Sequence, residues 1–190
     1  MGNIQRPNSM LFWKRKYNTD ELQRFYRNEI VNTESMLLSD MWAMTQEEQE
    51  KVHNYIQWLL PTDQNSDFNR RAPVLTKNDI DKLKSDFVVM DNLLKNVHSF
   101  LDFLGLDLLD DNNIQRKNDF EQRSEHWLRP RNHNYKRITR CLTFLRLFGF
   151  HDVADNLMMC LDELYRDYPD AIGQATYQYW QNAAFRPESQ

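Results

Sequence analysis

Six basic side chains gather around one predicted helix start and could together bind an anion. Asn132–Phe150 is predicted to form a helix, with Asn132 or Asn134 available to cap its start and Gly149 to end it. The basic residues lie in and just before its first turns, namely Arg129, Arg131, His133, Lys136, Arg137 and Arg140. Free backbone amides and the dipole at a helix N-terminus add to the attraction for negative charge. This pattern favours binding of a carboxylate or phosphate.

Arg137 differs from the other basic residues because helical periodicity puts it in the apolar sector. At about 100° per residue it projects between Phe144 and Phe148. A guanidinium that leaves bulk water needs an anion or a set of carbonyl groups beside it. The sequence leaves open whether that partner belongs to this chain, for example to the acidic residues of segment 107–125, or to a bound ligand.

The remaining reactive side chains show no catalytic or metal-binding spacing. The histidines at positions 53, 98, 126, 133 and 151 have no ligand spacing, and the chain contains no HExxH or CxxC motif. No serine lies in a GxSxG motif. We therefore expect no metal and no cofactor. Cys141 and Cys160 both fall on apolar helical faces, which predicts buried thiols in a reducing compartment and leaves a single disulfide open.

Composition favours helices and excludes several classes of protein. The 190 residues have a mass of 23.1 kDa, which suits one domain with a hydrophobic core. Only 4 glycines and 6 prolines are present, which argues against sandwiches and barrels. A net charge of −4 argues against general nucleic-acid binding. The longest apolar stretch, Phe87–Leu106, is interrupted by charged residues and cannot span a bilayer, so we expect a soluble, intracellular protein.

The elements that must position the basic cluster are predicted to form an all-α domain. We expect a single irregular bundle of roughly six to eight helices within residues 19–186, and no strand. Residues 1–18 are predicted to form a flexible N-terminal arm. Apolar residues 11–13 are followed by basic residues 14–16, which leaves open a peripheral contact with a membrane surface.

Two capping boxes divide the middle of the chain. The one at Thr45 begins a helix that is predicted to run to Leu60, immediately before Pro61. The one at Thr76 begins either one long helix or two helices that meet near Ser85–Asp86. Further helices are predicted after Asp152 and over 170–185.

Three of these segments together resemble one known family. His53–Pro61 (HNYIQWLLP) is similar to the HxYIQWLFP signature of the opioid growth factor receptor family's conserved domain, with Leu60 in place of the usual Phe. Arg71–Ile80 resembles its RAxxLTxxEI segment, with Asp79 in place of Glu. Asn132–Gly149 is similar to its NxxRITRxLxxLxxLG block.

This resemblance covers roughly residues 20–170 and implies a helical, non-enzymatic domain. Animal members are described as receptors for an enkephalin peptide, associated with nuclear and perinuclear membranes. For this chain we expect a receptor-like domain that binds a peptide or small anionic ligand through a basic and aromatic site. The expected ligand-binding residues are His53, Trp58, Arg71, His133, Arg137 and Arg140. Arg137 would supply a bidentate anchor for the anion.

Two other functions are left open by the sequence. A protein-interaction or effector module would bind a partner in a helix groove, for which methionines at helical spacing could supply an adaptable surface. An enzyme acting on a phosphorylated or nucleotide-like molecule is the less favoured reading, because no catalytic constellation accompanies the basic cluster.

Overall fold

The computed structural model describes residues 17–66 and 69–186. Its helices are α1 (Thr19–Tyr26), α2 (Leu38–Trp42), α3 (Gln46–Lys51), α4 (Ile56–Leu59), α5 (Lys77–Lys84), α6 (Phe87–Leu104), α7 (Phe120–Ser124), α8 (Asn134–Phe148), α9 (His151–Asp167), α10 (Pro169–Ile172) and α11 (Gln174–Ala184). A two-stranded antiparallel hairpin, β1 (Leu106–Leu108) and β2 (Ile114–Arg116), lies between α6 and α7. The predominantly α-helical class is confirmed. The proposed membrane contact of residues 11–16 lies outside the described residues.

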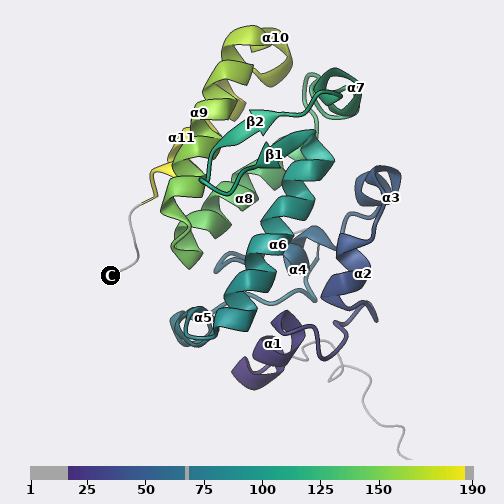
Figure 1. Ribbon diagram of the computed structural model, residues 1–190, viewed down its shortest axis with the longest axis vertical. Coiled ribbons are helices and arrows are strands. Elements are labelled where there is room, and N and C mark those ends of the chain that lie inside the picture. Colours follow the sequence, from purple (N-terminus) through teal and green to yellow (C-terminus); the bar gives the residue numbers. More distant parts are fainter. Residues whose placement is uncertain (1–16, 67–68, 187–190) are drawn as a thin grey trace, which may run out of the picture.

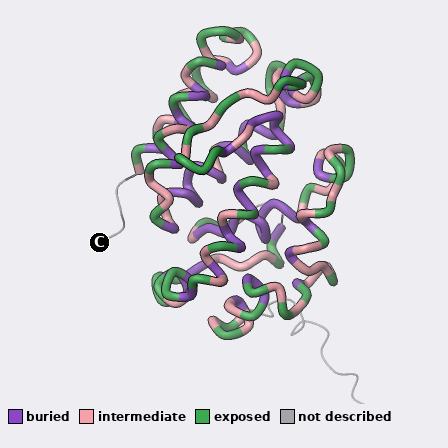
Figure 2. Tube along the Cα trace, viewed as in Figure 1, coloured by how far each residue is buried: buried purple, intermediate pink, exposed green. Residues whose placement is uncertain are grey.

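Helices α6 and α8 organise the bundle around them (Figure 1). α6 contacts α1, α2, α5 and α7, whereas α8 contacts α9 and α11. Side chains that are almost completely buried line both helices, including Phe100 and Phe103 on α6 and Phe144 and Phe148 on α8. Figure 2 shows buried positions along these central helices and exposed positions on the outer turns. Burial of this apolar surface is the main force that holds the helices together.

Local capping signals fix the ends of the two central helices. The Asp86 carboxylate accepts hydrogen bonds from the backbone N–H groups of Val88 and Val89, at 3.1 and 3.4 Å, and so begins α6. Gly105 ends it in the left-handed conformation, with φ of 80°. A Cβ at Gly105 would also lie 3.0 Å from Cβ of Arg123, so glycine is required there for both reasons.

The predicted count of six to eight helices is too low, because two predicted helices are broken. The predicted helix from Thr45 to Leu60 ends at Lys51, and Val52 has an extended backbone with ψ of 105°. The predicted 170–185 helix is divided at Gly173, where φ of 74° and ψ of 149° cannot continue a helix. Residues 77–104 form two helices that meet at Ser85–Asp86, one of the two alternatives given by the sequence.

The hairpin is a small addition to the predicted all-α bundle, for which the sequence carried no strand signal. Each strand is only three residues long, with Leu106 paired to Arg116 and Leu108 paired to Ile114. Three residues are too few to show alternating polarity in a sequence, so the pattern gave no signal. The pairing holds α7 against the end of α6, where the backbone N–H of Lys117 donates to the carbonyl of Gly105 at 2.9 Å.

Candidate functional site

The start of α8 lies where the sequence predicts, but its N-cap is His133, without a side-chain cap hydrogen bond, and not Asn132 or Asn134. Oδ1 of Asn132 accepts a hydrogen bond from the backbone N–H of Asn134 at 2.8 Å, and Gly149 ends the helix in the left-handed conformation. This geometry places His133 immediately before the first helical residue. Arg137 and Arg140 follow one turn apart; Arg137 projects towards the end of α3, and Arg140 projects towards Leu60 at the end of α4.

Arg137 is buried, and its partners are carbonyl groups of this chain. Its side chain and backbone together are only 5% exposed. Nη1 donates to the carbonyl oxygen of Gln49 at 2.9 Å, and Nη2 donates to that of Val52 at 3.3 Å. The guanidinium also lies 5.5 Å from the ring centroid of Tyr55. Of the alternatives that the sequence left open, a set of carbonyls is therefore the one found.

These contacts explain why the predicted 45–60 helix is broken. The last carbonyls of a helix have no partner within it and attract a cation. Arg137 satisfies those at the end of α3, and Arg140 donates from Nε to the carbonyl of Leu60 at 2.7 Å. The two arginines thus hold the two ends of residues 49–60. Burial lowers the pKa of Arg137 and lowers that of Arg140 to about 10.

Two exposed histidines lie next to this buried arginine. The rings of His53 and His133 meet edge to face, with their centroids 5.0 Å apart. Nη2 of Arg137 lies 3.4 Å from Nδ1 of His53, which makes that nitrogen the acceptor. Nε2 of His133 lies 3.6 Å from Oε1 of Glu50, and the His133 side chain is 41% exposed. We call this pair of imidazoles, at the surface above Arg137, the His53–His133 edge.

The pKa of His133 is lowered, which favours its neutral form. Partial burial is the largest cause of its lowered pKa, and the positive charges of Arg137 and Arg129 act in the same direction. The carboxylate of Glu50 opposes them. Glu50 is fixed by a hydrogen bond from Nδ2 of Asn134 to its Oε2 at 2.9 Å. Sequence reasoning missed Glu50, because it stands in the polar run 46–51 with no spacing signal that links it to α8.

Acids of segment 107–125 do not neutralise the arginines near α8. Two of these acids form ion pairs within their own segment, Asp107 with Lys117 and Asp119 with Arg123. Within residues 17–66 and 69–186, Arg129, Arg131 and Arg137 form no ion pair. Arg129 and Arg131 are exposed, so their charges face solvent beside the start of α8.

The other two predicted site residues lie in different surroundings. Trp58 is fully buried, with its ring 5.1 Å from that of Phe25 and 5.0 Å from that of Tyr17. Arg71 is exposed on a turn that is connected to the residue after His53, because Nδ2 of Asn69 donates to the carbonyl of Asn54 at 2.8 Å. Contacts therefore bring together His53, His133 and Arg137, whereas Trp58 lies in the core and Arg71 on the surface.

No group of three or more histidine, cysteine, aspartate or glutamate side chains suited to a metal ion is present in the described part of the chain. Both cysteines are free and buried, so the disulfide that the sequence left open is absent. Burial raises the pKa of each thiol, to about 11 for Cys160. Among the same described residues, no helix is both long enough and apolar enough to cross a membrane.

Comparison with known proteins identifies the family. Residues 15–189 match the family described as the opioid growth factor receptor (OGFr) conserved region. The chain belongs to the opioid growth factor receptor family. It is 35% identical over 142 residues to the opioid growth factor receptor-like protein 1 of Xenopus tropicalis, covering 71% of this chain and 27% of that protein.

Two further relatives are named as receptors themselves. The opioid growth factor receptor of Mus musculus is 34% identical over 146 residues, covering 73% of this chain and 23% of its own. The opioid growth factor receptor of Homo sapiens is 30% identical over 164 residues, which cover 82% of this chain and 24% of the human protein. The chain thus spans about a quarter of the length of these relatives. No solved structure matches it.

The structure gives a physical role to two of the segments that carry the family resemblance. Segment 53–61 and segment 132–149 contact each other through Arg137 and Arg140. The first segment supplies acceptors, and the second supplies the two guanidinium groups. The two arginines of the RITR sequence, Arg137 and Arg140, therefore contact the two ends of segment 53–61, at His53 and at Leu60.

Proposed function

We propose that this chain is a non-enzymatic, receptor-like binding module that binds a peptide or other small anionic ligand at the His53–His133 edge. The observation that carries the proposal is the pair of exposed imidazoles, 5.0 Å apart, fixed from below by Arg137 and Glu50. Imidazole N–H groups donate hydrogen bonds to carboxylate or phosphate oxygens. The name of two of the relatives, opioid growth factor receptor, agrees with ligand binding.

The six predicted residues divide into two roles in this proposal. His53 and His133 contact the ligand, and exposed Arg71 contributes positive charge from the neighbouring turn. Arg137, Arg140 and Trp58 position the segment that carries His53. Both Nη atoms of Arg137 already donate to carbonyls, so it supports the edge from inside and is no longer assigned the bidentate contact with the anion.

Local charge favours an anion over a cation at this edge. Arg129 and Arg131 are exposed close to the start of α8 and form no ion pair with any described residue. Glu50 is the acid that contacts the edge, and it is already engaged by Asn134 and His133. An anionic group that approaches the two imidazoles therefore meets a net positive field, which raises both its local concentration and its association rate.

An NMR titration of the histidine side chains tests this proposal. We expect an enkephalin pentapeptide, or inorganic phosphate in a parallel titration, to shift the imidazole signals of His53 and His133. Replacing both histidines by glutamine should weaken the binding about tenfold or more, because two hydrogen bonds to an anion are lost. His151→Gln, at the half-buried histidine that begins α9 and lies in neither proposed site, is the control and should leave the affinity unchanged.

Each result has a defined meaning. Shifts with the peptide alone identify a peptide site, and shifts with phosphate identify a general anion site; both support the proposal. Affinity that is unchanged in the double variant, or shifts that appear at His98 instead, would place the ligand elsewhere and overturn it. Absence of any shift up to millimolar concentrations of both probes would overturn it as well.

A further inference from the structure

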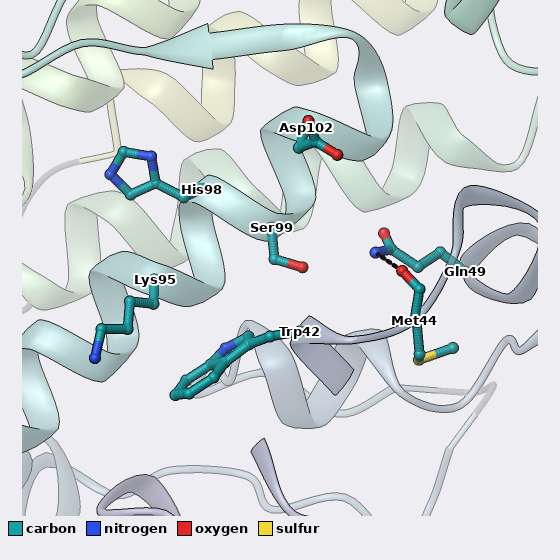
Figure 3. Close-up of a pocket in the computed structure, with 7 residues that line it drawn as sticks. All are labelled: Trp42, Met44, Gln49, Lys95, His98, Ser99 and Asp102. Atoms are coloured by element: carbon teal, nitrogen blue, oxygen red, sulfur yellow. Dashed lines mark hydrogen bonds between the residues drawn. The ribbon is translucent and has the colours of Figure 1, made fainter. Parts of the chain in front are cut away.

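A depression of about 400 Å³ lies between α6 and the α2–α3 region (Figure 3). It is lined by Trp42, Met44, Gln49, Lys95, His98, Ser99 and Asp102. Gln49 separates it from the His53–His133 edge, since the backbone carbonyl of Gln49 binds Arg137 while its side chain lines the depression. A volume of this size matches the lower range of ligand sites in proteins.

Buried hydrogen bonds hold the aromatic wall of this depression in place. Nε1 of Trp42 donates to Oδ1 of Asn96 at 2.6 Å. Asn96 is fully buried and in turn donates from Nδ2 to the carbonyl of Leu59 at 2.8 Å. The Trp42 indole is therefore anchored to the core through its polar edge and exposes part of its apolar ring. A ligand that packs on this ring does not have to order it first, which favours binding.

The opposite end of the depression is similarly rigid. Nε2 of Gln49 donates to the carbonyl of Met44 at 3.2 Å, as Figure 3 shows, and Oε1 accepts from the Tyr55 hydroxyl at 3.3 Å. Met44 is half-buried and packs against the core. Trp42 and Met44 thus offer an apolar surface that can adapt to the shape of a side chain, as methionine does at many binding surfaces.

The α6 side of the depression carries a positive charge with no acidic partner. Nζ of Lys95 lies 5.5 Å from the ring centroid of Trp42, and within the described residues its hydrogen-bond partner is the neutral Oδ1 of Asn92. The carboxylate of Asp102 is already compensated, because Lys117 lies 2.6 Å and Arg123 3.4 Å from its oxygens. The net charge that faces a ligand is therefore positive.

Ser99 adds a free hydrogen-bonding group between these two sides. It is half-buried, and its hydroxyl oxygen points into the space between Trp42, Gln49 and Asp102 (Figure 3). No described residue forms a hydrogen bond with this hydroxyl. It stands one turn beyond Lys95 on α6, so one acceptor group could contact both side chains.

We propose that this depression binds a short segment of a partner protein in which an aspartate or glutamate stands next to an aromatic or large apolar residue. The apolar side chain packs on Trp42 and Met44, and the carboxylate accepts hydrogen bonds from Nζ of Lys95 and the Ser99 hydroxyl. Charge complementarity selects this partner over a basic segment. The site is separate from the His53–His133 edge, although both adjoin Gln49.

Titration of the full chain with a blocked peptide, acetyl-Glu-Phe-Leu-Glu-amide, tests the proposal. The indole N–H signal of Trp42, assigned with Trp42→Phe, should shift on binding. The charge-reversed peptide acetyl-Lys-Phe-Leu-Lys-amide should bind at least tenfold more weakly. Lys95→Glu should weaken the binding of the acidic peptide at least tenfold. Ser99→Ala should weaken it about threefold to tenfold, as expected for loss of one hydrogen bond.

The double variant His53→Gln/His133→Gln tests which site the peptide occupies. Neither histidine lines the depression, so binding that is read from the Trp42 indole signal should keep its affinity in this variant. If the double variant no longer binds the acidic peptide while the Lys95→Glu variant still binds it, the peptide occupies the His53–His133 edge and the depression is not the site. Equal binding of the two peptides, self-association that shifts Trp42 without peptide, or the absence of any Trp42 shift would each overturn the proposal as well.

Discussion

At the scale of single residues, Arg137 is a buried cation stabilised by backbone carbonyls in place of an acid. A buried guanidinium without compensation would be strongly unfavourable. Here the carbonyls of Gln49 and Val52 and the ring of Tyr55 supply that compensation. The same contact fixes the position of His53, because Nη2 of Arg137 also lies 3.4 Å from its Nδ1. One side chain therefore links the core of the bundle to its candidate binding surface.

His133 and His126 make the stability of the folded chain depend on pH. Burial lowers the pKa of both below the ordinary histidine value of about 6.5. The unfolded chain therefore binds protons at a higher pH than the folded chain does, and stability falls as the pH decreases below about 7. Urea unfolding between pH 7.5 and 5.5 should show this decrease, with a slope of at most about 1.4 kcal/mol per pH unit for each histidine.

His126→Gln provides the check on this assignment. Nδ1 of His126 lies 3.3 Å from Nε2 of Gln46, and the buried Nε2 of His126 has no hydrogen-bond partner among the described residues. Glutamine cannot be protonated in this range, so the variant should lose part of the slope. A slope identical to that of the unsubstituted chain would show that His126 does not contribute.

The candidate site could be predicted only in part from the sequence. Periodicity placed Arg137 inside the helix's apolar sector, and its burial confirms that prediction. Periodicity could not supply the partner, because the carbonyls of Gln49 and Val52 become available only when α3 ends at Lys51. Glu50 was missed for the same reason, since its contact with α8 joins residues that are 84 positions apart.

At the scale of elements, Asp86 connects α1 to α6. Its side chain caps α6, and it lies 2.7 Å from Nε of Arg27, which directly follows α1. Gln23 of α1 also donates to it at 2.6 Å. Arg27 is the main reason that the pKa of Asp86 is lowered to about 2. A depressed carboxyl pKa means that stability is present above the unfolded value of about 3.9 and is lost as the pH falls towards 2.

Substitutions at Asp86 should separate its two contributions. Asp86→Asn can still cap α6 but loses the charge that faces Arg27, so we expect a loss of about 1–2 kcal/mol. Asp86→Ala loses both the cap and the charge, and it should lower the free energy of unfolding by about 2–4 kcal/mol. Urea unfolding at pH 7 gives these values. The exposed Asp170→Ala is the control and should change stability by less than about 0.5 kcal/mol. Equal losses in the two Asp86 variants would contradict the role as a cap.

Local signals predicted the elements that local chemistry controls. The capping boxes at Thr45 and Thr76 and the glycine ends at Gly105 and Gly149 were all found where the sequence indicated. The break at Val52 was missed because a distant arginine, and not a local proline or glycine, satisfies the freed carbonyl there. The short hairpin was missed because three-residue strands carry too little pattern.

At the scale of the whole molecule, two segments far apart in the sequence form one unit. Residues 49–60 lie between α6 and α8, held by Asn96 of α6 and by Arg137 and Arg140 of α8. The His53–His133 edge and the depression beside Trp42 lie on either side of this segment. The conformation of residues 49–60 therefore positions side chains at both proposed binding surfaces. A substitution that makes this segment more mobile should weaken binding at both.

Hydrogen–deuterium exchange of Arg137→Lys tests this account most directly. Lysine keeps the charge but cannot reach both carbonyls, so the segment should lose part of its support. We expect faster amide exchange within residues 49–60 and no change within 151–184, since the hydrogen-bond and ring partners of Arg137 all lie outside α9 to α11. Unchanged exchange at 49–60, or an equal increase at 151–184, would contradict the claim that Arg137 holds the segment that carries the site.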